Sequence, residues 1–283
     1  MPAPQPFTPA QIEAALGGRY TISNEIRPGA QGSVYLARRQ STTSGVQTDD
    51  AVALKLYFAS VELDRIEREI EAMEHIRHPS LAGLVEHGTI NLEGQPIKFV
   101  AWQFVHGEAL DYRVTGSALP FKVIACIGRD VSSAIAELWS KRIIHRDIKP
   151  PNIMLRHGDA EAVLIDLGVA RHLAQPSLTA YGATWGTVGY MSPEQCRTER
   201  NLTCKSDMFS LGVVLLEALG GAHPTSRDQN RLAVGTVPRA TTVNPLVPSG
   251  FATLIDSLLT VRAAFRPDPQ VAALEFDRWA NLF

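Results

Sequence analysis

The sequence has few cysteines, little net charge and no long apolar run, and each shortage excludes a class of protein. The three cysteines among 283 residues, Cys126, Cys196 and Cys204, lack metal-ligand spacing and are too few for a disulfide framework. A net charge of −2 gives no reason to expect nucleic acid or an anionic membrane as partner. No apolar run approaches the roughly 20 residues that span a bilayer, and no signal-peptide pattern opens the chain. We therefore expect a soluble, cytoplasmic protein without a membrane span, and the sequence leaves its oligomeric state open.

What the sequence does contain is enough apolar residues, 45% of the total, for one large buried core or two smaller ones. Short segments of alternating polarity predict five antiparallel strands, at residues 20–26, 33–38, 52–58, 84–89 and 97–104. Apolar residues spaced three and four apart predict helices over 60–76 and from residue 121 onward. This order indicates an α+β protein with a tail and a short helix over residues 1–19, a sheet domain over 20–103 and a mainly helical domain over 104–283.

The stretch 143–152 is the most informative part of the sequence. Apolar residues flank it on both sides, so that short buried strands can hold a polar loop. Within it, Asp147 can orient a hydroxyl group and accept its proton, Lys149 can neutralise phosphate charge, and the carbonyl oxygen of Asn152 suits magnesium. A second carboxylate, Asp166, follows fourteen residues after Asn152 at the end of another apolar run. Two oxygen ligands on adjacent loops are what a metal-bound triphosphate requires.

These residues resemble the protein kinase family, in particular the eukaryotic-like (Hanks-type) Ser/Thr protein kinases of bacteria. The triplet 145–147 is similar to the family's catalytic triplet, and the triplet 166–168 is similar to its metal-binding triplet, with Leu167 in place of the usual Phe. The resemblance runs from about Tyr20 to Trp279 and implies a bilobal fold. Its N-lobe would be a five-stranded antiparallel sheet with one main helix, and its C-lobe mainly helical. The implied activity is transfer of the γ-phosphate of ATP to protein hydroxyl groups, with Mg²⁺ or Mn²⁺.

The resemblance also implies how ATP is held. Lys55 would bind the α- and β-phosphates and would itself be held by Glu69, while Asp147 and Lys149 would act at the transferred phosphate and Asn152 and Asp166 would bind the metal. The other implied nucleotide contacts are Gly29, Gly32, Val34, Ala53, Gln103, Val105 and Met154. Two departures stand out: Arg27 occupies the place of the first glycine of the phosphate loop, and a bulky Trp102 lies at the back of the expected adenine pocket.

Residues 166–194 are rich in small and hydroxyl side chains and resemble an activation segment, whose closing stretch contains Thr187 and Glu194. The resemblance implies that Asp207 braces the catalytic loop, that Arg266 pairs with Glu194, and that Thr187 and Lys149 favour Ser/Thr over Tyr substrates. We predict autophosphorylation at one or more of Ser177, Thr179 and Thr184, received by the cations Arg65, Arg146 and Arg171. Alternatively, Arg65 and Arg171 are simply solvated.

Residues 224–248 depart from the family pattern, since they predict at most a short helix near 227–234 where the family has a docking helix. Two other interpretations therefore stay open. The chain could be a pseudokinase that binds nucleotide without turnover, or a small-molecule phosphotransferase with the same Asp-to-Asn spacing.

Overall fold

The computed structural model describes residues 7–29, 32–40, 51–58, 67, 70–71, 73–156, 158, 161–166, 171–172, 187–199 and 201–283. The chain forms two compact units. The first unit comprises residues 1–75 and 82–104, and the second comprises residues 76–81 and 105–283. A single short segment, 76–81, is thus the part of the chain before residue 105 that folds with the second unit.

The first unit contains a five-stranded antiparallel sheet with the strand order β1-β2-β3-β5-β4. Its strands are β1 (Tyr20–Gly29), β2 (Gly32–Arg39), β3 (Ala51–Tyr57), β4 (Leu84–Leu92) and β5 (Gln95–Gln103). Buried and exposed positions alternate along most of β4, whereas β3, in the middle of the sheet, is buried at nearly every position. The predicted five-stranded sheet is therefore confirmed.

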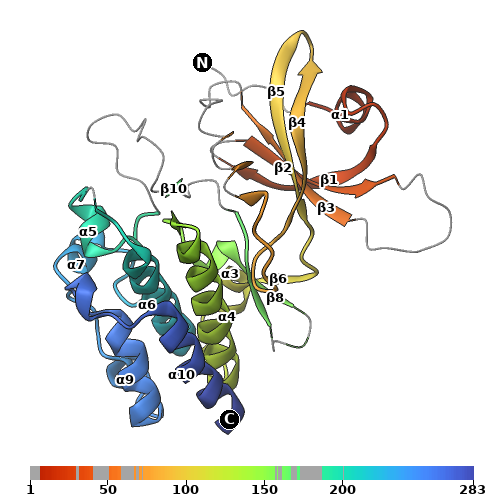
Figure 1. Ribbon diagram of the computed structural model, residues 1–283. Helices are drawn as coiled ribbons and strands as arrows, with labels where there is room; N and C mark the ends of the chain where they lie inside the picture. Colours follow the sequence, from red (N-terminus) through yellow and green to blue (C-terminus); the bar gives the residue numbers. More distant parts are fainter. Residues whose placement is uncertain are drawn as a thin grey trace. The chain divides into compact units, whose positions relative to one another are not determined.

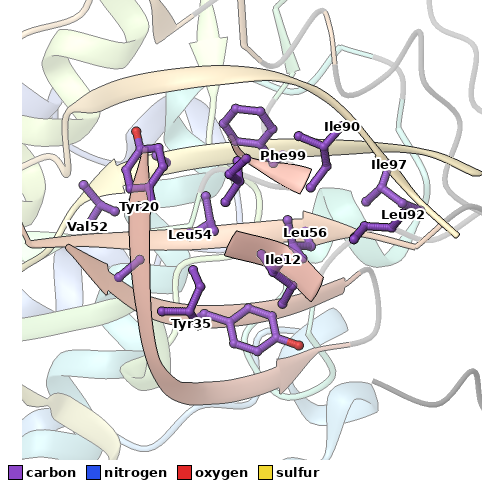
Figure 2. Close-up of a cluster of buried hydrophobic side chains, with 14 residues drawn as sticks. Ile12, Tyr20, Tyr35, Val52, Leu54, Leu56, Ile90, Leu92, Ile97 and Phe99 are labelled. Atoms are coloured by element: carbon purple, nitrogen blue, oxygen red, sulfur yellow. The ribbon is translucent and has the colours of Figure 1, made fainter. Parts of the chain in front are cut away.

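One face of this sheet is covered by α1 (Pro9–Ala15), which packs against β1 and β4 (Figure 1). Thr8 and Gln11 form a capping box at the start of α1, and the Glu13 carboxylate accepts a hydrogen bond of 2.6 Å from the Ile22 N–H. Figure 2 shows the resulting cluster, in which Ile12 of α1 lies among the buried side chains of the sheet. Its members come from all five strands as well as α1. The structure thus has a short helix within residues 1–19, as predicted, and this helix is part of the core.

The opposite face of the sheet carries a smaller cluster. Buried Tyr57 and Val100 pack there with Ile70, and the half-buried Trp102 lies against them. Ile70 is one of the residues of the predicted 60–76 helix that the structure describes, and it is helical. Lys55 pairs in register with Val100, so it projects from this same face.

The second unit is mainly helical, as predicted. Its elements are β6 (Gly107–Ala109), α3 (Leu110–Arg113), α4 (Phe121–Ser140), β7 (Ile143–Ile144), η1 (Pro150–Asn152), β8 (Ile153–Arg156), β9 (Ala162–Leu164), β10 (Arg171–His172), α5 (Pro193–Cys196), α6 (Cys204–Gly220), α7 (Gln229–Ala233), α8 (Ala240–Val243), α9 (Ser249–Leu258), η2 (Ala263–Phe265) and α10 (Pro269–Leu282). Within residues 224–248 the described helices are α7 and α8, of five and four residues. This agrees with the expectation of at most short helix there, although α8 was not predicted.

Helix α6 lies at the centre of this unit, and fifteen of its seventeen residues are buried. Helix α4 packs against both α6 and α10 (Figure 1). The contact between α4 and α10 is so close that a Cβ atom added to Gly128 would lie 2.5 Å from the Phe276 ring. Two small antiparallel sheets, β10-β7 and β6-β8-β9, complete the unit and flank the loop 145–152. Across the described part of the chain, no helix combines the length and apolar character that crossing a membrane requires.

Candidate active site

The loop that follows β7 is held in place through its backbone. The carboxylate of Asp207, on α6, accepts hydrogen bonds from the N–H groups of His145 (2.9 Å) and Arg146 (2.8 Å). On the far side, the Gln195 amide donates to the Arg146 carbonyl over 3.2 Å. Burial raises the pKa of Asp207, whereas the two N–H donors favour its charged form. Arg146 has a φ of 69°, a conformation that L-residues adopt at a cost, so the bonds to Asp207 and Gln195 stabilise an unusual backbone turn.

Asp147, Lys149, Asn152 and Thr187 form one polar cluster after this turn. The Lys149 ammonium lies 2.7 Å from Asp147 Oδ2 and donates to Thr187 Oγ1 over 2.6 Å. The Thr187 hydroxyl in turn donates to Asp147 Oδ1 over 2.5 Å. Asn152 Nδ2 donates to the Asp147 carbonyl (2.8 Å) and to Asp147 Oδ2 (3.2 Å). Asp147 therefore holds a hydroxyl group and an ammonium group at the same carboxylate.

The second carboxylate, Asp166, is tied to the same loop through the backbone. The N–H of its neighbour Ile165 donates to the Asn152 carbonyl over 2.8 Å, and β8 pairs with β9 just before it. Asp166 itself has a φ of 58°. Because Asn152 uses its amide nitrogen on Asp147, its side-chain carbonyl oxygen is the group left to act as a metal ligand. Carboxylate and amide oxygens are the kinds of ligand that Mg²⁺ and Mn²⁺ prefer.

The stretch that follows Thr187 is anchored to the core by two ionisable side chains. The Tyr190 hydroxyl donates to buried Glu217 on α6 over 2.7 Å. Glu194 forms a two-pronged ion pair with Arg266, whose Nη1 and Nη2 lie 2.6 and 2.9 Å from its oxygens. Burial alone raises the pKa of Glu194, but the hydrogen bonds and charge of Arg266 outweigh burial and lower it. The geometry of the expected pair of Glu194 and Arg266 is therefore present.

In the first unit, Lys55 lies on β3 between Val34 of β2 and Val100 of β5. Its side chain is mostly buried, and its ammonium lies 5.0 Å from the centre of the Tyr57 ring, within the range of a cation–π contact. Gly32 is needed for strand pairing itself, since a Cβ there would lie 2.0 Å from the Leu56 carbonyl oxygen. Strand packing therefore explains why a glycine occupies position 32, independently of any contact with phosphate.

The remaining predicted residues fall into three groups. The structure describes the side chains of four of them. Ala53 lies opposite Trp102 of β5, Gln103 is exposed, Val105 is buried, and Met154 lies on β8. For Gly29 and Arg171 the structure gives the backbone pairing, with Gly32 and with Ile144. Outside the described residues lie Arg65, Glu69, Ser177, Thr179 and Thr184.

Several side chains that build this site were not predicted from the sequence. Gln195, which donates to the loop after β7, also forms a capping box with Ser192, and the Ser-x-x-Gln spacing is a signal that could have revealed it. Ser206 donates to Glu194 over 2.7 Å. His223 and Gln229 both contact Gly189, and nothing in their local sequence pattern indicates this.

Comparison with known sequences identifies the class of protein that this arrangement defines. The family described as protein kinase domain matches residues 20–274. Because this match covers most of the chain, the chain belongs to the protein kinase domain family. The predicted resemblance is thereby confirmed.

Individual relatives are bacterial proteins with serine/threonine-protein kinase in their names. The probable serine/threonine-protein kinase PknB of Lactococcus lactis is 31% identical over 257 residues, which cover 87% of this chain and 39% of the relative. PrkC of Bacillus subtilis is 31% identical over 86% of this chain and 38% of its own length. PknB of Mycobacterium tuberculosis H37Rv is 29% identical over 89% of this chain and 41% of its own length. The chain thus spans about two fifths of the length of these curated relatives.

Proposed function

We propose that this chain is a Ser/Thr protein kinase that transfers the γ-phosphate of ATP to protein hydroxyl groups. The observation that carries the proposal is the contact of the Thr187 hydroxyl with Asp147 and Lys149, at 2.5 and 2.6 Å. A threonine hydroxyl bound between a carboxylate and an ammonium group supports the proposal that Asp147 holds the acceptor alcohol. The family match and the names of the relatives support the same reaction.

In the proposed reaction, Asp147 orients the substrate hydroxyl and accepts its proton. The hydroxyl oxygen forms a bond to the γ-phosphorus, the bond from that phosphorus to the β–γ bridging oxygen breaks, and ADP leaves. Lys149, 2.7 Å from Asp147, offsets the negative charge that gathers on the transferred group. Thr187 and Lys149 together favour Ser and Thr as acceptors. The catalytic side chains are thus Asp147 and Lys149, with Lys55 and Glu69 at the nucleotide.

A divalent cation, Mg²⁺ or Mn²⁺, is part of the proposal, and Asn152 and Asp166 would hold it. When bound, the ion would neutralise phosphate charge and orient the triphosphate. For ATP itself, Lys55 would bind the α- and β-phosphates and Glu69 would hold Lys55. The other proposed nucleotide contacts are Gly29, Gly32, Val34, Ala53, Gln103, Val105 and Met154.

Regulation by phosphorylation completes the proposal. Arg65, Arg146 and Arg171 would receive a phosphate placed on Ser177, Thr179 or Thr184, with Thr187 as the residue that links the segment to Asp147.

We further infer a tail and helix at 1–19, an N-lobe at 20–103 and a C-lobe at 104–283, with protein substrates as partners. The free state of all three cysteines supports a cytoplasmic location.

The test is transfer of labelled phosphate from ATP to dephosphorylated casein in the presence of Mg²⁺. Wild-type protein should label casein on serine and threonine, and an Asp147→Asn variant with an unchanged circular-dichroism melt should not. Nucleotide binding without casein labelling would favour the pseudokinase interpretation. Labelling of a small alcohol in preference to casein would favour the small-molecule phosphotransferase.

A further inference from the structure

Gly189 is held at both of its backbone polar groups by side chains. Its N–H donates to Gln229 Oε1 over 2.7 Å, and its carbonyl oxygen accepts from His223 Nε2 over 2.8 Å. Gly189 has a φ of 97°, in the region that favours glycine, and a Cβ there would lie 3.0 Å from the Arg227 Cβ. Two residues before it, Thr187 contacts Asp147. Gln229 and His223 therefore fix the turn that presents Thr187 to the catalytic aspartate.

The other ring nitrogen of His223 holds its own loop together. Nδ1 accepts from the N–H groups of Thr225 (3.2 Å) and Arg227 (2.9 Å). Ser226 and Arg227 are non-glycine residues with φ values of 52° and 62°, which this double contact helps to stabilise. A carbonyl oxygen can only accept, so Nε2 carries the hydrogen, and Nδ1 must carry none. The neutral ring thus satisfies three backbone groups at once, whereas a protonated ring would point a donor at two donors.

We propose that neutral His223 is a positioning residue for the 187–190 turn, and that protonating this histidine loosens the turn and slows phosphate transfer to protein substrates. The inference rests on the proposed kinase function. His223 touches neither the acceptor hydroxyl nor ATP in this scheme, and acts through Gly189. The proposal therefore predicts a fall in phosphate transfer at acidic pH that disappears when His223 is replaced by a residue that cannot titrate.

The charged and titratable groups around His223 agree with a neutral ring at pH 7. Burial lowers the pKa of His223, the Gly189 carbonyl opposes this, and the positive charge of Arg227 lowers it again. The Tyr190 ring, from the turn, meets the imidazole of His223 edge-on, with 5.1 Å between the ring centres. The Tyr190 hydroxyl donates to Glu217 on α6. Burial raises the pKa of Glu217, and the Tyr190 hydrogen bond and the charge of Arg227 oppose this rise. Burial and the Glu217 carboxylate raise the pKa of Tyr190, and Asp111 on α3 adds a smaller raising effect on both groups. Since the folded-state pKa of His223 lies below the ordinary value of about 6.5, the ring is mostly neutral at pH 6.5 and above, and the turn loses the support of this ring as the pH falls from 6.5 through the lowered pKa.

The test measures kcat/KM for casein and KM for ATP between pH 5.5 and 8 in three variants. His223→Gln keeps a donor that reaches toward Gly189 but cannot titrate, His223→Asn keeps an acceptor near Nδ1 but is too short to reach Gly189, and His75→Gln changes an exposed histidine as a control. At pH 7.5 we expect His223→Asn to lower kcat/KM for casein about threefold to tenfold, the value of one hydrogen bond, with KM for ATP unchanged. The ratio of wild-type to His223→Gln activity should fall as the pH drops below 6.5, and the ratio of wild-type to His75→Gln activity should stay constant.

A second readout is hydrogen exchange of the backbone amides at residues 188–191, which requires no turnover. Exchange there should speed up in wild-type protein between pH 7.5 and 5.5, after correction for the intrinsic pH dependence of exchange, and should not do so in His223→Gln. Constant activity ratios together with unchanged protection would overturn the proposal. If wild-type protein does not label casein at all, the kinase function fails, and hydrogen exchange alone decides whether His223 holds the turn.

Discussion

Replacing Arg266 by Met should destabilise the second unit strongly while preserving most of the side-chain volume. The Arg266 side chain is fully buried, pairs with Glu194 through two nitrogens, and lies over the Phe209 ring at 4.9 Å. It also donates to three backbone carbonyls, those of Thr260, Lys205 and Val261. Met would keep the packing but leave the Glu194 carboxylate buried, with Ser206 as its remaining side-chain donor.

The expected loss of unfolding free energy is about 3–5 kcal/mol, the usual cost of breaking a buried ion pair from one side. Glu194→Gln should cost less, because the three carbonyl acceptors of Arg266 remain in place. Urea denaturation followed by circular dichroism gives both values. Arg278→Met is the matched control, since its pair with Glu275 lies on the exposed face of α10 and should contribute no more than about 0.5 kcal/mol. A loss below about 1 kcal/mol for Arg266→Met, or one equal to the control, would refute the reasoning.

Three further outcomes are expected. Lys55→Met and Asp166→Asn should each abolish casein labelling while the urea midpoint stays within about 0.5 M of wild type, and wild-type turnover in either variant would remove that residue from the site. Compounds that extend behind the adenine of ATP should bind weakly because of the Trp102 indole, and Trp102→Ala should tighten their binding at least about tenfold; tight binding to wild type that Trp102→Ala does not improve would contradict the assignment. Intact-mass analysis after incubation with ATP and Mg²⁺ should show added phosphate within residues 177–184. Arg146→Ala should then lower the activity of the phosphorylated form more than that of the unphosphorylated form, and equal losses would argue against activation by phosphorylation.

The five strands and helix α4 were predictable from the sequence because alternating polarity marks the strands and apolar residues three and four apart mark the helix. The strand starting at Tyr20 and the helix starting at Phe121 begin where their patterns begin. Helix α6 begins at Cys204 because the Thr203 hydroxyl caps it by accepting a hydrogen bond from the Lys205 N–H. The short strands β9 and β10 carry too few residues to show any period.

The grouping of Asp147, Lys149 and Asn152 was predictable because these residues are close in sequence. The contact of Thr187 with Asp147 joins residues forty positions apart, and its geometry depends on how the turn after Thr187 is held. That turn depends on His223 and Gln229, whose role is to satisfy backbone groups of Gly189. Side chains that bond to a distant backbone leave no local pattern, so the structure was needed to find them.

The central claim, that Asp147 acts in phosphate transfer and not in nucleotide binding, is tested most directly by measuring both properties on Asp147→Asn. Affinity for ATP and Mg²⁺ comes from calorimetry, and the transfer rate comes from single-turnover labelling of casein. We predict an affinity within about threefold of wild type and a transfer rate lower by at least about 100-fold, the usual contribution of a general base. A transfer rate equal to that of wild type, or a loss of nucleotide binding that accounts for the whole loss of rate, would contradict the assignment.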